Sequence, residues 1–257
     1  KAQDKFKLYQ DLVELLVGQN DVKTAFYYQE KSNITGLSEQ TRGGDNGPTR
    51  SNELLAGVEE QSVAKELELK IDGYYGELIK ERSKPAEQQS ADKINKLLDL
   101  INVSETNFQG FVDSAIIASG GDQNSFSSTI DPKKLDNARF SLGDEDIVIE
   151  YLATENQLLI FAASNNSLNA RKVNIKKAEL ISLINEFQQQ VSTSKSDKNI
   201  VLKNSEKLYQ LFIAPIEDLL TEKKRIALVP TGILYKLPFQ ALGKLEGVKI
   251  NFLIKNF

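Results

Sequence analysis

Hydrophobic residues recur at helical spacing in two short runs near the start of the chain. The first run consists of Leu8, Leu12, Leu15 and Leu16, and the second of Val22, Ala25, Phe26 and Ile34. Asn20-Asp21 interrupts the pattern between them, so two short helices are predicted over residues 5–36. Two helices of this length cannot bury their apolar faces alone, and a neighbouring element must cover them.

Two longer helical patterns follow, separated at Ser83-Lys84-Pro85 because proline cannot continue a helix. Their apolar stripes are Val63, Leu67, Ile71, Tyr74 and Leu78, widened by Ala64 and Tyr75, and then Ile94, Leu97, Ile101, Phe108, Phe111 and Ala115. The two patterns predict a long antiparallel hairpin. Further apolar residues flank both stripes, so we expect the hairpin to dock on other helices or on a sheet. An isolated coiled-coil arm with these residues exposed is the alternative.

Beyond residue 130 the hydrophobic period changes and strands alternate with helices. The expected elements are a helix over 132–138, strands over 146–154, 157–163 and 171–175, helices over 176–191 and 199–221, and strands over 225–229 and 248–254. Glu155-Asn156 fits a hairpin turn, and Pro215 can kink its helix. A strand so near the end leaves a sheet edge, and the first helical pair looks equally unfinished, so we expect a piece of a longer protein.

These patterns divide the chain into four segments. They are a tetratricopeptide-like helical pair over 1–41, a flexible linker over 42–51, the long hairpin over 52–118 and an α/β part over 130–257. The linker prediction rests on the three glycines and one proline between Thr41 and Ser51. The repeat pattern rests on Tyr9, Leu12, Leu16, Asn20 and Ala25. Val13 and Ser32 replace the usual Gly and Ala of that repeat, so an unrelated helical hairpin fits as well.

The composition excludes several kinds of chemistry but says little about the fold. The 257 residues have a formal net charge of −4 and a pI near 5.2, which argues against non-specific nucleic-acid binding. Cys, His, Met and Trp are all absent, so the chain has no thiolate nucleophile and no imidazole base or ligand. No apolar run has the length of a membrane span, and no signal peptide opens the sequence. We expect a cytoplasmic protein that binds neither membranes nor cofactors.

Other candidate chemistry is weak. Ser62-x-x-Lys65 and Ser192-x-x-Lys195 have the spacing of a Ser-Lys dyad but lack the motifs that accompany one. Asp144-Glu145-Asp146 lacks the spacing and glycine of a calcium loop, and a solvated turn explains it better. No glycine-rich phosphate-binding motif is present. The sequence therefore assigns no catalytic, cofactor-binding or metal-binding residue.

The most specific pattern lies in the last fifty residues. It comprises Leu208-Tyr209, Pro215-Ile216, Leu219, the run Arg225 to Pro230, Gly232, Leu234 and the run Leu237-Pro238-Phe239-Gln240-Ala241-Leu242. Here the sequence resembles the CHAT family of caspase-like cysteine peptidases, whose strand ends in Pro-Asp-Gly before a Leu-Pro-Phe-x-x-Leu turn. Thr231 stands where that family usually has Asp. The resemblance extends well over residues 130–257 and loosely over residues 5–115.

The resemblance implies an α+β fold in which helical hairpins precede an incomplete caspase-like α/β domain. Family enzymes carry their catalytic His and Cys beyond the matched region, so we expect the chain alone to cleave no peptide. The implied function is a regulatory and scaffold part of such a peptidase that binds protein partners through its helices. The alternative is a stand-alone helical interaction module with an α+β domain and no peptidase link. Neither interpretation specifies an oligomeric state.

Overall fold

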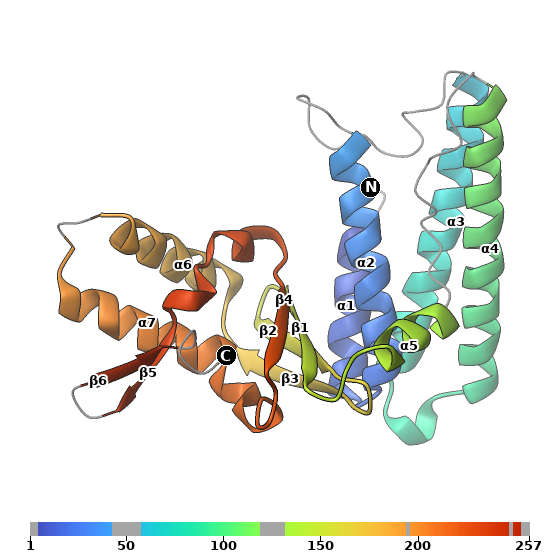
Figure 1. Ribbon diagram of the computed structural model, residues 1–257. Helices are drawn as coiled ribbons and strands as arrows, with labels where there is room; N and C mark the ends of the chain where they lie inside the picture. The colour runs from blue at the N-terminus through green and yellow to red at the C-terminus, as the bar shows by residue number, and fades with distance from the viewer. Residues whose placement is uncertain (1–4, 43–57, 119–131, 194–195, 247–248, 253–257) are drawn as a thin grey trace. The chain divides into compact units, whose positions relative to one another are not determined.

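Residues 5–42, 58–118, 132–193, 196–246 and 249–252 are described by the computed structural model of the chain (Figure 1). They combine helices with a four-stranded mixed sheet, as expected for an α+β protein. The chain divides into a helical unit, residues 1–134, and an α/β unit, residues 135–257. Most of the predicted linker, residues 43–51, lies outside the described residues.

Two helical pairs build the helical unit. They are α1 (Lys5–Gly18) with α2 (Val22–Arg42), and α3 (Val58–Arg82) with α4 (Ala91–Ala118), and α3 also packs against α1. Between α1 and α2 the chain reverses at Asn20, whose φ of 61° is left-handed, a conformation that asparagine tolerates better than most residues. A short 3₁₀ helix, η3 (Ala86–Gln88), follows Pro85 within the α3–α4 connection.

The long hairpin is not a free arm. Tyr75 is completely buried, and its ring lies edge-on to that of Tyr9 on α1, with 5.3 Å between the ring centroids. The expected docking on a third element is therefore confirmed. The predicted α3 stripe is confirmed in part: Ile71 and Leu78 are buried, whereas Val63 is 40% exposed and Tyr74 is half-buried. The fully buried apolar residues of α3 are Ala64, Ile71, Tyr75 and Leu78. They face α1, which covers that side of the helix.

A mixed sheet forms the centre of the α/β unit. Its strands are β1 (Asp146–Ala153), β2 (Gln157–Ala163), β3 (Leu168–Asn174) and β4 (Arg225–Val229), in the order β3-β2-β1-β4. The two hairpins β1–β2 and β2–β3 are antiparallel, as the sequence predicted for the first of them. β4 pairs in parallel with β1, with Ile149 opposite Leu228.

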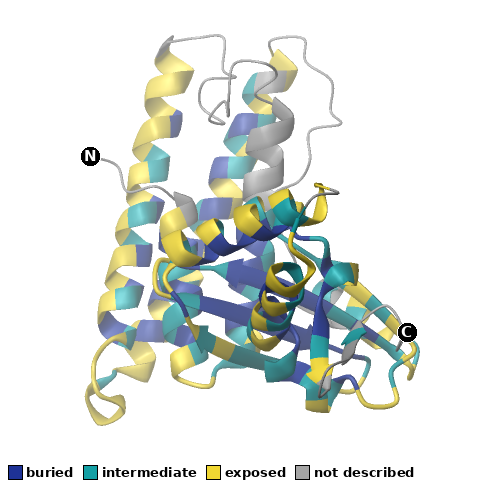
Figure 2. Ribbon diagram, turned by 90° about the vertical axis from the view of Figure 1, so that its left-hand side faces the viewer, coloured by how far each residue is buried: buried dark blue, intermediate teal, exposed yellow. Residues whose placement is uncertain are grey.

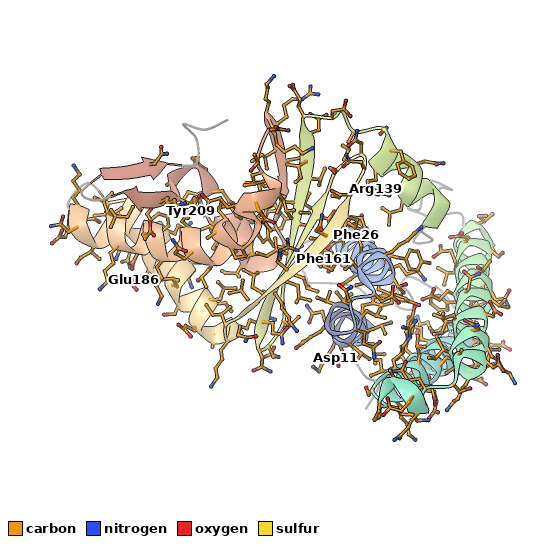
Figure 3. The ribbon with its side chains drawn as sticks, turned by 90° about the horizontal axis from the view of Figure 1, so that it is seen from below. Asp11, Phe26, Arg139, Phe161, Glu186 and Tyr209 are labelled. Atoms are coloured by element: carbon orange, nitrogen blue, oxygen red, sulfur yellow. The ribbon has the colours of Figure 1, made fainter. Side chains whose placement is uncertain are left out.

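Two helices, α6 (Lys177–Val191) and α7 (Lys198–Phe212), cover one face of this sheet. Their buried residues form one core with Ile147, Ile149 and Tyr151 of β1 and with Leu158 and Ile160 of β2. The intervening residues of β2 are buried too, so this strand is buried on both faces, which explains its continuous apolar run (Figure 2). Figure 3 shows side chains of the two helices, among them Glu186 on α6 and Tyr209 on α7.

The segment after α6 and the last strands depart most from the prediction, and β3 begins at Leu168 where a strand over 171–175 was predicted. α7 ends at Phe212 and is followed by a 3₁₀ helix, η4 (Ala214–Leu219), so Pro215 accompanies the end of an α-helix and does not kink a longer one. β5 (Gly243–Glu246) was missed, and it pairs with β6 (Lys249–Phe252) in a separate two-stranded sheet. The remaining helix, α5 (Pro132–Phe140), was predicted and precedes β1.

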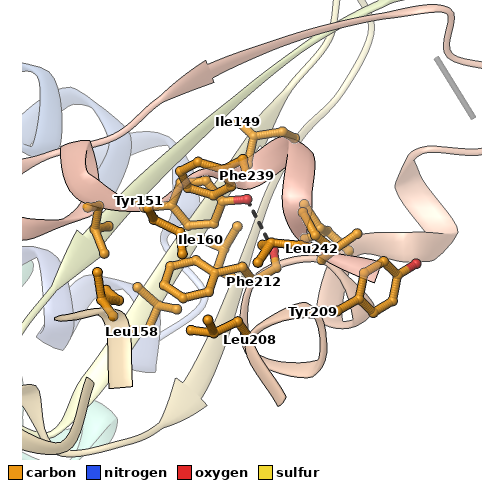
Figure 4. Packing of buried hydrophobic residues seen from close by; sticks show 14 of the residues in the cluster. Ile149, Tyr151, Leu158, Ile160, Leu208, Tyr209, Phe212, Phe239 and Leu242 are labelled. Carbon is orange, nitrogen blue, oxygen red and sulfur yellow. Dashed lines mark hydrogen bonds between the residues drawn. The ribbon is translucent and has the colours of Figure 1, made fainter. Parts of the chain in front are cut away.

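The Leu-Pro-Phe turn is anchored in the aromatic centre of the core (Figure 4). The ring of Phe239 stacks on that of Tyr151 at 5.4 Å and meets that of Phe212 edge-on at 5.7 Å. The hydroxyl of Tyr151 donates to the carbonyl of Phe212 over 3.1 Å, so its one polar group is satisfied. The turn consists of two 3₁₀ helices, η5 (Gly232–Lys236) and η6 (Phe239–Ala241), and Gly232 opens it at a left-handed φ of 54°.

We predict that Phe239→Ala lowers the free energy of unfolding of the α/β unit by roughly 3–5 kcal/mol, because it removes a buried ring from this cluster. Urea denaturation followed by circular dichroism measures the change. Tyr235→Ala is the matched control, since Tyr235 lies in the same turn but is 68% exposed, and it should stay within about 0.5 kcal/mol. Equal stability of the two variants would show that the ring does not anchor the turn.

Candidate functional site

The Ser62–Lys65 pair lies on the exposed face of α3. Both side chains are exposed to solvent there, so the described residues form no pocket around them that could hold a substrate. Ser192 is exposed at the end of α6, and Lys195 lies outside the described residues.

The acidic stretch at residues 144–146 is paired with basic side chains. Asp146 binds Arg225 in a bidentate manner, at 2.5 Å from Nε and 2.9 Å from Nη2, and Glu145 lies 2.5 Å from Lys224. The hydrogen bonds from Arg225 lower the pKa of the Asp146 carboxyl. These contacts tie the start of β1 to the start of β4, and no acidic group that could hold a metal ion is found within the described ranges.

Five buried side chains of the helical unit form a polar cluster, which we call the Glu105 cluster. It consists of Tyr9 on α1, Tyr28 and Lys31 on α2, Tyr75 on α3 and Glu105 on α4. Oε1 of Glu105 accepts hydrogen bonds from the hydroxyls of Tyr9 at 2.9 Å and Tyr75 at 2.7 Å. Oε2 accepts a short hydrogen bond from Nζ of Lys31. Each of the four helices therefore contributes at least one member.

The local sequence places both charges inside the helical packing. Glu105 lies four residues after Ile101 and three before Phe108, and both of these are buried, so the carboxylate shares their face. Lys31 lies three residues after Tyr28 on α2, and its Nζ is 4.9 Å from the ring centroid of Tyr27. The aromatic face adds a cation–π attraction to the ion pair.

The electrostatics of the cluster keep its phenols protonated. Burial, followed by the negative charge of Glu105, raises the pKa of Tyr9 well above its usual value and raises that of Tyr28 as well. Burial also raises the pKa of Tyr75, with the neighbouring Tyr9 and Glu105 as further causes. All three phenols therefore stay protonated, and those of Tyr9 and Tyr75 donate to the carboxylate.

This arrangement is an anchor for helix packing, and it has no access for a substrate. Both charged side chains are at most 10% exposed, and both carboxylate oxygens already accept hydrogen bonds. A buried ion pair contributes little stability compared with apolar packing, but removing one partner typically costs about 3–5 kcal/mol. The cluster therefore favours one arrangement of the four helices over others.

Two further buried polar atoms lie on α2. Oε1 of Gln29 and Oγ of Ser32 have no hydrogen-bond partner among the described residues, and the two residues are 0% and 1% exposed. A buried polar group without a partner costs about 1–3 kcal/mol. α2 thus carries both the lysine of the ion pair and unsatisfied polar atoms.

A second set of polar side chains, around Glu81 and Arg82, links the α3–α4 connection with the α1–α2 turn. The carboxylate of Glu81 accepts hydrogen bonds from Lys84 at 2.7 Å and from the backbone N–H of Ser90 at 3.0 Å, which caps the start of α4. These hydrogen bonds, that from Lys84 foremost, lower the pKa of Glu81 to about 2. Arg82 reaches Asp21 at 3.3 Å and so ties the α3 end to the α1–α2 turn.

The sequence interpretation missed Glu105 and Lys31. A signal for Glu105 was present, because it fills the i+4 position between Ile101 and Phe108 where the apolar stripe skips a turn. No local signal pairs it with Lys31, which lies 74 residues away in the chain.

Comparison with known proteins finds no matching family, no similar curated protein and no similar solved structure. Among the helices described, none combines the length and the apolar character needed to cross a membrane.

We predict that Lys31→Met destabilises the helical unit by about 3–5 kcal/mol, because Glu105 then stays buried without its cation. Adding Glu105→Gln should restore part of the loss, since a neutral amide oxygen still accepts from Tyr9 and Tyr75. Lys70→Met, at an exposed position of α3, is the control and should change stability by less than about 0.5 kcal/mol. Equal effects of the two lysine variants in urea denaturation would contradict the buried pair.

We predict a pH dependence from Glu81. Its pKa is about 2 in the folded chain and near 4.5 without its partners, so its stabilising contribution is complete above 4.5 and is lost as the pH falls towards 2. Glu81→Gln should therefore flatten the fall in the free energy of unfolding over this pH window. Glu66→Gln, exposed on the same helix, should leave the slope unchanged. If all three proteins give the same slope, the hydrogen bonds to Glu81 do not stabilise the fold.

Proposed function

We propose that this chain is the non-catalytic regulatory and scaffold portion of a CHAT-family, caspase-like cysteine peptidase. In this proposal the helical unit takes protein partners, and the α/β unit supports a catalytic half that carries the His and Cys. The chain itself has neither residue, and its buried carboxylate in the helical unit is already saturated with donors. A supporting role is therefore better matched to its chemistry than catalysis.

The free edge of β4 is the observation that carries the proposal. β4 pairs with β1 on one side, and no strand in the described part of the chain pairs with its other side. Ile226 and Leu228 pack on the core, and Ala227 is exposed. After Arg225 the strand has no charge to discourage a neighbour. Natural sheets protect an exposed edge, so an apolar edge of this kind suits a sheet that continues past β4.

The opposite edge of the sheet provides an internal comparison. β3 carries Arg171 and Lys172 in its middle, and charged residues of this kind are a usual protection of an edge strand. The same sheet thus has one protected edge and one edge that resembles an interior strand. Because β1 and β4 are parallel, a further parallel strand could extend the sheet, and chemistry in such sheets gathers at the carboxyl ends of the strands.

A hydrogen bond explains why threonine suits position 231, where the CHAT family usually has Asp. Its Oγ1 donates a hydrogen bond of 2.9 Å to the carbonyl of Tyr151 at the end of β1. An ionised aspartate could not donate to that carbonyl. The threonine therefore holds the turn after β4 against β1, which supports a structural role for the matched motif.

We predict that the reading frame of the gene continues beyond Phe257 into strands that bear a His and a Cys. In the longer protein the amides of β4 should exchange about tenfold or more slowly than in this chain, because a further strand would accept their outward hydrogen bonds. The amides of β3 are the control and should exchange alike in both proteins. A frame that closes without these residues, or β4 amides that exchange equally in both, would favour the stand-alone interaction module.

A further inference from the structure

Buried polar side chains are concentrated on one helix of the helical unit, α2. Gln29, Lys31 and Ser32 lie within four residues and are 0%, 6% and 1% exposed. Lys31 donates to Glu105, and Nε2 of Gln29 donates to Oδ1 of Asn33 at 3.2 Å, but Oε1 of Gln29 and Oγ of Ser32 have no hydrogen-bond partner among the described groups. Water would satisfy both atoms, so α2 gains more from leaving its position than an apolar helix would.

If α2 moves away, Glu105 keeps two of its hydrogen-bond donors. Tyr9 and Tyr75, which donate to Oε1 of Glu105, lie on α1 and α3. They would stay in place when α2 moves, while Lys31 would become solvated. What is lost is the cation at Oε2, the ring contacts of Tyr28 with Tyr75 at 5.9 Å and with Tyr9 at 6.2 Å, and the burial of Ala25 and Phe26. An incoming helix must restore these apolar contacts as well as the cation.

We propose that α2 is a displaceable helix, and that the surface beneath it on α1, α3 and α4 binds an amphipathic helix of a partner protein carrying one buried lysine. The charge of Glu105 selects the lysine, because an apolar replacement would leave Oε2 without a cation. The rings of Tyr9 and Tyr75 provide the apolar contact beside it. A partner helix with apolar residues in place of Gln29 and Ser32 would fit the surface better than α2 does.

This inference rests on the proposed role of the helical unit in binding protein partners, and it is independent of the relation to peptidases. Its tests involve α2 alone, whereas the proposed function is tested at β4. A failure of one is therefore distinguishable from a failure of the other.

The first test is amide exchange of the whole chain, read by mass spectrometry. Residues 25–33 of α2 should exchange about tenfold or more faster than residues 71–78 of α3, because α2 opens without the hairpin. Gln29→Leu with Ser32→Ala should slow exchange in α2 alone, and Ser62→Ala, an exposed position on α3, should change nothing. Exchange of α2 and α3 at one common rate, or α2 exchange that the double substitution leaves unchanged, would overturn the proposal.

The second test uses a labelled peptide of residues 22–42 that carries Gln29→Leu and Ser32→Ala, added to the whole chain. Fluorescence anisotropy should show that it binds, and that adding Lys31→Met to the peptide weakens binding about tenfold or more, as expected for loss of a buried charge partner. Equal binding of the two peptides would mean that Glu105 does not select a lysine. Absence of binding by both would mean that α2 cannot be displaced.

Discussion

A buried carboxylate must be surrounded by donors, and in the helical unit this requirement fixes where four helices can lie. Glu105 draws two phenols and one ammonium from three other helices. Apolar stripes alone would allow α3 to rotate by one residue, with Tyr74 inward in place of Tyr75. The hydroxyl of Tyr75 reaches Glu105 only in the observed rotation, so a polar contact selects among packings that are similar in apolar area.

In the α/β unit, aromatic contacts and few charged groups favour one packing over others. Tyr151, Phe212 and Phe239 meet at 5.3–5.7 Å, and the only polar group among these rings bonds to a helix-end carbonyl. Thr231 and the pair Asp146–Arg225 then fix the two ends of β4 against β1. The pair is solvent-exposed and contributes little energy, so its role is to set the register of the parallel strands.

Hydrophobic period alone located most of the helices and strands, because a repeat of 3.6 or 2 residues reflects which face is covered. It placed Tyr74 in the α3 stripe and Tyr75 only beside it, since the choice between them depends on contact with Tyr9 of α1, 66 residues earlier in the chain. It missed β5, whose four residues include a glycine and two charges. It also missed the Glu105 cluster, because a charged residue in an apolar stripe has two local explanations, a break in the stripe or a buried pair, and only the partner decides between them.

Polar groups have opposite effects on the two hairpins of the helical unit. In the α3–α4 hairpin, Glu81 is satisfied by two donors from the connection, Lys84 and the Ser90 amide, and by Lys93 at the start of α4, so the pair is held together locally. In the α1–α2 pair, Lys31 donates across the unit to Glu105, Nε2 of Gln29 donates to Asn33 on the same helix, and Oε1 of Gln29 and Oγ of Ser32 have no partner among the described residues. At Glu81 the long hairpin therefore satisfies its buried charge locally, whereas Glu105 on the same hairpin and Lys31 on α2 need each other across the unit. Because the buried charge of α2 finds its counter-charge on α4, a competing helix that brings apolar side chains and one lysine can meet the same requirement.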